Sequence, residues 1–131
     1  VLLVEKIEFS NNIIYLPLIL LLLLLISIGV AVLINSLIMQ FRDIIHIIPF
    51  LLRIGIFISP VAFSADIIDK KYAELFYLNP ITGFIELTRW SIIKDYPFPE
   101  YCYISLFTGL FLSVTGIIYF IKIEKEIVDR I

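Results

Sequence analysis

The sequence predicts an all-helical membrane protein with three transmembrane helices and a short re-entrant or interfacial helix pair between the last two. Of its 131 residues, 61% are hydrophobic and the mean hydropathy is +1.06, well above the values of soluble domains. Three apolar segments, at about 13–39, 44–63 and 101–121, each have at least the roughly 20 residues that cross a bilayer as a helix. An amphipathic segment at about 72–94 lies between the last two.

The first span, 13–39, carries no charged side chain and is dominated by Leu, Ile and Val. These residues favour insertion of a helix into hydrocarbon. Ser27, Ala31 and Asn35 recur at four-residue intervals and therefore share one helix face. We expect this small and polar line to contact another helix.

The second span, 44–63, follows a short polar break that suits a tight turn. One face of the expected helix, which we call the Arg53 face, comprises Arg42, His46, Pro49, Arg53, Phe57 and Pro60. An arginine near the middle of a span costs about 2.5 to 3.5 kcal/mol, which the surrounding apolar residues outweigh. We expect the Arg53 face to point to a bundle interior or an aqueous path, and the two prolines to kink the helix.

The segment at about 72–94 is expected to form two short helices. Asn79 and Pro80 divide it, because Asn is a favoured N-cap and Pro a favoured first helical residue. The second helix has apolar residues on one face and Glu86 and Arg89 on another. It is too short to cross a bilayer, so the pair is expected to dip into the membrane edge or a protein groove.

The third span, 101–121, is uncharged and carries a seam of small residues. They recur at intervals of three or four: Ser105, Gly109, Ser113 and Gly116. Small residues let two helix backbones approach closely. We expect this seam to form a helix contact.

Composition excludes several classes of site. With one cysteine and one histidine, no internal disulfide, multi-cysteine metal site or bis-histidine haem site can form. A net charge of −2 with scattered basic residues argues against a nucleic-acid partner. No G-x-x-x-x-G-K-[ST] loop is present to bind ATP, so we expect neither a cofactor nor a metal in this chain. It begins at Val1 without a signal-peptide pattern, and we expect it to be a piece of a longer protein whose missing part lies upstream.

Two functions other than transport are open from the residues alone. His46 and Asp43 lie three residues apart and would suit acid–base chemistry in a membrane-bound lipid-modifying enzyme, although no recognisable nucleophile motif accompanies them. A non-transporting membrane anchor would also use the lines of small residues. The charged Arg53 within an apolar span and the dipping helix pair favour a transport path instead.

Two sequence segments together resemble a known family. They are FRDIIHIIPFLLRIGIFISPVAF, from Phe41, and LFYLNPITGFIELTRWSII, from Leu75. The pattern, with its anchors Phe41-Arg42-Asp43, Pro49-Phe50, Ser59-Pro60, Leu78-Asn79-Pro80, Gly83, Glu86 and Arg89-Trp90, is similar to the C-terminal half of the membrane subunit of ABC-type polysaccharide exporters. These permeases export O-antigen of lipopolysaccharide, capsular polysaccharide or teichoic acid. The similarity covers roughly Gly29 to the end of the chain.

The resemblance implies a six-span permease of the bacterial or archaeal cytoplasmic (inner) membrane. Such a permease forms a homodimer, binds two separate ATPase subunits that hold ATP and Mg, and passes a lipid-linked glycan through a channel between the protomers. This chain, 1–131, would be spans four to six, with a cytosolic C-terminus and no enzymatic activity of its own. Open alternatives are an ABC-type permease for a drug or lipid, and a non-transporting anchor or enzyme subunit.

The resemblance also implies roles for particular residues. The helix pair between the last two spans would form an outer gate. The channel or gate candidates are Arg53, Tyr72, Tyr77, Phe84, Glu86, Arg89 and Trp90, and the cytosolic hinge candidates are Arg42 and Asp43. The aromatic candidates could stack on passing sugar rings or anchor the chain at the interface. Arg53 departs from the family, where an uncharged polar residue such as Gln is common, and could line the path, form an internal ion pair or snorkel.

Overall fold

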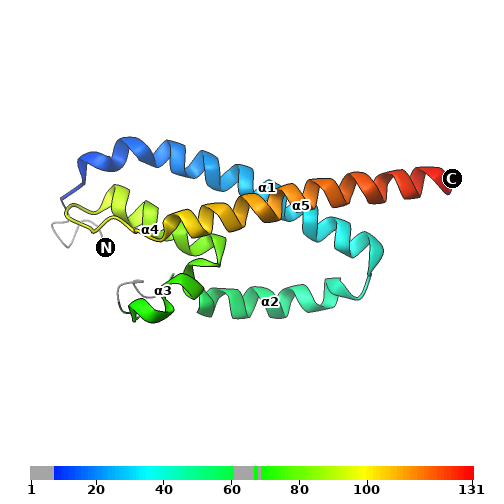
Figure 1. Cartoon of the computed structure of the whole chain (residues 1–131), viewed down its shortest axis with the longest axis horizontal. Coiled ribbons are helices and arrows are strands. Elements are labelled where there is room, and N and C mark those ends of the chain that lie inside the picture. Colours follow the sequence, from blue (N-terminus) through cyan, green and yellow to red (C-terminus); the bar gives the residue numbers. More distant parts are fainter. Residues whose placement is uncertain (1–7, 61–66, 68) are drawn as a thin grey trace.

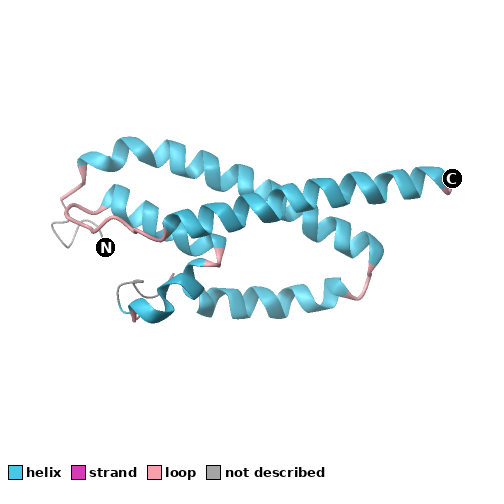
Figure 2. Ribbon diagram, in the orientation of Figure 1, coloured by secondary structure: helices cyan, strands magenta, loops and turns pink. Residues whose placement is uncertain are grey.

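The computed structural model describes residues 8–60, 67 and 69–131, and the regular secondary structure in them is helical (Figures 1 and 2). The elements are η1 (Asn11–Tyr15), α1 (Leu16–Gln40), α2 (Ile44–Ile58), α3 (Lys70–Tyr77), α4 (Pro80–Ile92) and α5 (Cys102–Asp129). One isolated antiparallel bridge joins Phe9 to Ile93. The predicted all-helical class is confirmed for the described residues.

Within the described part of the chain, two helices are long and apolar enough to cross a membrane. They are the continuous stretch Asn11–Gln40, with a hydropathy of 3.1, and Cys102–Asp129, with a hydropathy of 2.0. The third helix expected to span, α2, has 15 residues. At 1.5 Å per residue it covers about 22 Å, short of the roughly 30 Å of a hydrocarbon core. A third span therefore stays a prediction, and its last part, 61–63, lies outside the described residues.

Pro60 ends α2 where the sequence suggested a kink. The residue before a proline disfavours the helical conformation, and Ser59 is extended with φ −83° and ψ 143°. Pro60 also has no N–H to continue the helical ladder. Pro49, by contrast, lies inside α2 without ending it.

The close pairing of α1 with α5 depends on small residues (Figure 1). The four predicted seam residues of α5 are all buried. A Cβ on Gly29 of α1 would lie 2.3 Å from the Ser113 Cβ, and one on Gly116 would lie 2.7 Å from the Gly29 carbonyl oxygen. Such contacts are possible only for glycine. The Ser113 hydroxyl lies within 2.8 Å of the Gly109 carbonyl and 3.2 Å of the Ile26 carbonyl, so its hydrogen bond is satisfied inside the interface.

The small and polar line predicted on α1 is not covered by another described helix, so its contact stays a prediction. Ser27, Ala31 and Asn35 are exposed, and the buried residues of α1 are instead Ile19, Ile26, Gly29 and Ser36. Because α1 is apolar on every side, its own composition does not select a face. The fit of Gly29 against Ser113 selects it.

The helix α4 packs against α1 and α5 near the N-terminal ends of both helices, as Figure 1 shows. Ile19, Ile26 and Phe84 form the buried core there, surrounded by partly buried leucines and Val30. Gly83 lets α4 approach α5, because its N–H donates to the Ser105 hydroxyl at 3.0 Å and a Cβ would lie 2.4 Å from the Ser105 Cβ. This packing holds α4 in a defined position.

The predicted break before α4 is confirmed. Pro80 is the first residue of α4, and the Asn79 side chain caps the helix by accepting from the Ile81 N–H at 3.1 Å. The Asn79 side chain also donates to the Ser59 hydroxyl at 3.0 Å, at the end of α2. The cap thereby joins the start of α4 to α2.

The helix α2 runs beside the rest of the molecule, and none of its residues is buried. An apolar cavity of about 470 Å³ separates its inner face from α1 and the start of α4. Its lining includes Ile34 and Leu37 of α1, Ile44, Ile48, Leu51 and Gly55 of α2, and Ile81 of α4. At 100° per residue, Arg53 lies on the opposite side of α2 from Ile44 and Gly55. The part of the Arg53 face that lies on α2, from His46 to Phe57, thus points away from the other described helices, whereas Pro60 is buried and contacts α4.

Candidate functional site

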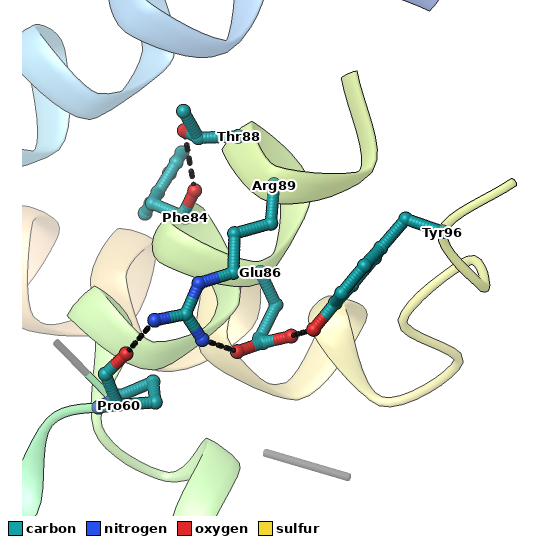
Figure 3. A network of polar contacts seen from close by, with 6 residues as sticks. All are labelled: Pro60, Phe84, Glu86, Thr88, Arg89 and Tyr96. Carbon is teal, nitrogen blue, oxygen red and sulfur yellow. Dashed lines mark hydrogen bonds and ion pairs between the residues drawn. The ribbon is translucent and has the colours of Figure 1, made fainter. Parts of the chain in front are cut away.

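A buried polar network is centred on Glu86 of α4. Its side chain is 2% exposed, and both carboxylate oxygens accept hydrogen bonds (Figure 3). Oε1 accepts from Arg89 Nη1 at 2.7 Å, and Oε2 accepts from the Tyr96 hydroxyl at 2.6 Å. A buried charge is costly unless it is paired and hydrogen-bonded, and here it is both.

Arg89 extends the network to α2. Its Nη2 donates to the carbonyl oxygen of Pro60 at 2.5 Å, as Figure 3 shows. The planar guanidinium carries several donors in fixed directions, so one side chain can hold the Glu86 carboxylate and the Pro60 carbonyl together. Together with the bond between Asn79 and Ser59, this gives two polar links between α4 and the C-terminal end of α2.

Aromatic rings hold the C-terminal end of α4. Trp90 lies between Tyr15, stacked at a centroid distance of 5.8 Å, and Phe98, in an edge contact at 5.2 Å. Backbone hydrogen bonds from Ser10 to Ile92 at 3.0 Å, and from Lys94 to Glu8 at 3.2 Å, fix the same end. The described surroundings of Trp90 are therefore those of a packed residue.

The other predicted aromatic residues lie in different environments. Phe84 is 2% exposed within the core, and Tyr77 is 6% exposed, with its ring 6.0 Å from that of Tyr101. Tyr72 is 54% exposed on α3, with the Lys71 ammonium 5.8 Å from its ring centroid. A role for any of them in a channel or gate stays a prediction, and of these three only Tyr72 presents an open ring surface.

The predicted basic and hinge residues lie apart from this network. Arg53 is exposed and makes no hydrogen bond or ion pair with any residue that the structure describes. Arg42 and Asp43 form the turn between α1 and α2, at the end of the molecule opposite α4 (Figure 1). The helix α2 is thus a direct connection between that turn and the Glu86 network.

Sequence reasoning missed several members of the network. Tyr96 was not among the predicted site residues, and Ser59 and Pro60 stood only as motif or kink positions. Tyr96 and Pro60 lie outside the helices, where no periodicity places a side chain, and their partners are distant in sequence. The described residues contain no group of three His, Cys, Asp or Glu side chains that could hold a metal ion.

A family model described as "ABC-2 type transporter" matches residues 5–93, which include α1 to α4. The chain belongs to the ABC-2 type transporter family. In this ABC-2 family member, Glu86 and Arg89 lie within the matched residues, whereas Tyr96 and α5 lie after them in the sequence. The resemblance to transporter membrane subunits is confirmed, and the two membrane-capable helices agree with it.

Two curated relatives of this ABC-2 family member are O-antigen export system permease proteins RfbA from Klebsiella pneumoniae. They are 26% and 22% identical to it over 114 residues, which is 87% of this chain. The chain spans 44% of the length of each relative. No solved structure matches the chain significantly.

Proposed function

We propose that this chain is the C-terminal half of a permease subunit that exports a lipid-linked polysaccharide across the cytoplasmic membrane of a bacterium or archaeon. Relatives matched over 87% of the chain are O-antigen export permeases, which supports a glycan as the cargo. The family supports a separate ATPase partner, which would bind ATP and Mg. The substrates compatible with the proposal are O-antigen, capsular polysaccharide and teichoic acid.

One structural observation carries the proposal: α2 presents Arg53 away from the other described helices and is hydrogen-bonded at its end to α4. An unpaired arginine at membrane depth is costly in lipid and is expected to face a protein interior or water. In a homodimer, the Arg53 faces of two copies would line a shared path. Hydrogen bonds from Asn79 to Ser59 and from Arg89 to Pro60 would then transmit a movement of α2 to α4.

The two ends of the molecule take different roles in this proposal. The turn at Arg42 and Asp43 and the C-terminus lie at one end, which would face the cytosol and respond to the ATPase (Figure 1). The helix pair α3 and α4 lies at the other end and would form the outer gate. ATP binding in the partner would shift α2, and α4 would yield as the polymer passes.

A permease for a lipid or another apolar substrate is the second candidate. The apolar cavity of about 470 Å³ between α1, α2 and α4 favours it, because most of its lining is isoleucine and leucine. A lipid-linked glycan would also present a lipid chain to such a surface. The glycan dependence of ATP hydrolysis separates the two candidates.

The decisive experiment is to purify the full-length protein together with an ATPase encoded beside it and to measure ATP hydrolysis. We expect the two proteins to copurify and hydrolysis to rise with lipid-linked glycan from the same cells, but not with the free lipid carrier. Stimulation by the carrier alone would favour the lipid candidate. Failure of any ATPase to associate would contradict the exporter proposal.

A further inference from the structure

A pocket of about 260 Å³ opens between α3 and the segment 96–101, separate from the apolar cavity beside α2. The α3 side contributes Lys70 and Tyr77, the segment contributes Tyr96, Phe98, Glu100 and Tyr101, and Glu86 of α4 also lines it. The volume is just below the roughly 300–1,000 Å³ of pockets for small molecules, which suits one ring-sized group.

The residues that line the pocket differ in their exposure. Lys70, Phe98 and Glu100 are exposed at the mouth, whereas Tyr77 and Glu86 are buried. The half-buried Tyr101 ring lies 6.0 Å from that of Tyr77 at an interplanar angle of 46°. Prolines at 97 and 99 restrict the backbone of this wall, so the wall is preorganised for a ligand.

The lining discriminates among chemical classes of ligand. A phosphate or another anion would meet the carboxylates of Glu86 and Glu100, and a purely apolar group would desolvate the charged groups at the mouth. A sugar ring suits the pocket, because its C–H faces can pack on tyrosine rings and its hydroxyls can bond to both Lys70 and Glu100. The mouth carries one basic and one acidic side chain, Lys70 and Glu100. Because neither sign of charge dominates, an uncharged sugar fits the mouth better than a charged one.

From this geometry we infer that the pocket between α3 and the segment 96–101 binds one uncharged sugar residue of the exported glycan. The inference rests on the proposed function and adds a binding subsite to it. The pocket shares Glu86 and Tyr96 with the polar network, and through Arg89 it is connected to Pro60 at the end of α2. A sugar in the pocket would therefore bias the same contacts that join α2 to α4.

Photo-crosslinking in cells tests the pocket with the cell's own glycan as the probe. In the full-length protein, a benzophenone amino acid replaces Phe98, which is 53% exposed, and in a control it replaces Phe107 of α5, which is 73% exposed. After illumination, the purified permease is examined for a covalent adduct by periodate-based glycan staining. We expect an adduct at position 98 and none at position 107.

A second pair of variants tests the recognising carboxylate. Glu100→Ala should reduce the adduct at position 98 about tenfold or more, the scale expected for one hydrogen bond to a charged group. Glu124→Ala, which removes an exposed carboxylate near the other end of α5, should leave the adduct unchanged. If the replacement at position 98 prevents accumulation of the protein, the benzophenone instead replaces Ala73 of α3, which also lines the pocket and has no role in the proposed recognition.

The outcomes separate this inference from the proposed function. If cells export glycan through an export-competent benzophenone variant and no adduct forms at the mouth, the pocket assignment is overturned and the exporter proposal stands. An equal adduct at position 107 would also overturn it, because the crosslink would then report general proximity. If deletion of the gene leaves surface glycan unchanged, the exporter proposal itself fails.

Discussion

The Arg89 guanidinium donates a hydrogen bond to the Pro60 carbonyl at 2.5 Å, and this contact joins α4 to the C-terminal end of α2. The same guanidinium holds Glu86 through its other terminal nitrogen at 2.7 Å. One side chain therefore connects the helix with the Arg53 face to the helix of the proposed gate. The first two predictions concern this network.

Arg89→Ala should impair export with little loss of membrane insertion. The variant leaves the Glu86 carboxylate buried without its cation and removes the bond to Pro60. Insertion is determined by the apolar length of α1 and α5, which the change does not touch. Surface glycan and the amount of permease in the membrane are measured in the same cells. Arg89→Lys, which keeps the charge but loses the planar fork, should be intermediate, and normal export by Arg89→Ala would remove the gate assignment.

Tyr96→Phe should lower the thermal stability of the detergent-solubilised full-length protein. The change removes the hydroxyl that donates to Glu86 Oε2 at 2.6 Å, so a buried carboxylate oxygen loses a partner at a cost of about 1–3 kcal/mol. Tyr103→Phe is the matched control, because Tyr103 is 61% exposed on α5. An equal melting temperature for the two variants would argue against a structural role of the Tyr96 hydroxyl.

Gly29→Ala should weaken the pairing of α1 with α5. The new Cβ would lie 2.3 Å from the Ser113 Cβ, and relief of such an overlap costs about 1–3 kcal/mol. Gly55→Ala is the control, since no described atom lies within 4 Å of a Cβ there. Thermal melting and limited proteolysis should show loss for the first variant and none for the second. Unchanged stability of Gly29→Ala would show that the two backbones are farther apart than described.

Features determined by local sequence were predictable. Asn79 caps α4 by bonding to a residue only two positions ahead, and Pro80 is the first residue of that helix. The seam from Ser105 to Gly116 is recognised from the small size and regular spacing of its residues. Both features could therefore be predicted without knowing which distant elements contact them. The face of α1 and the partners of Glu86 depend on tertiary contacts. The apolar α1 has no preferred side until Gly29 meets Ser113, and Tyr96 is ten residues from Glu86 in a segment without helical periodicity.

Arg53→Gln should preserve assembly and export. Arg53 makes no hydrogen bond or ion pair with a described residue, so the change breaks no contact in that part of the chain, and glutamine retains hydrogen-bonding capacity toward water or cargo. Water at this face is tested directly by thiol labelling. In a Cys102→Ser background, Arg53→Cys should react with a polar maleimide, whereas Ile48→Cys, on the face toward the apolar cavity, should react slowly. Loss of assembly in Arg53→Gln would instead indicate a structural ion pair with a part of the protein outside the described residues, and equal labelling of the two cysteines would contradict an aqueous Arg53 face.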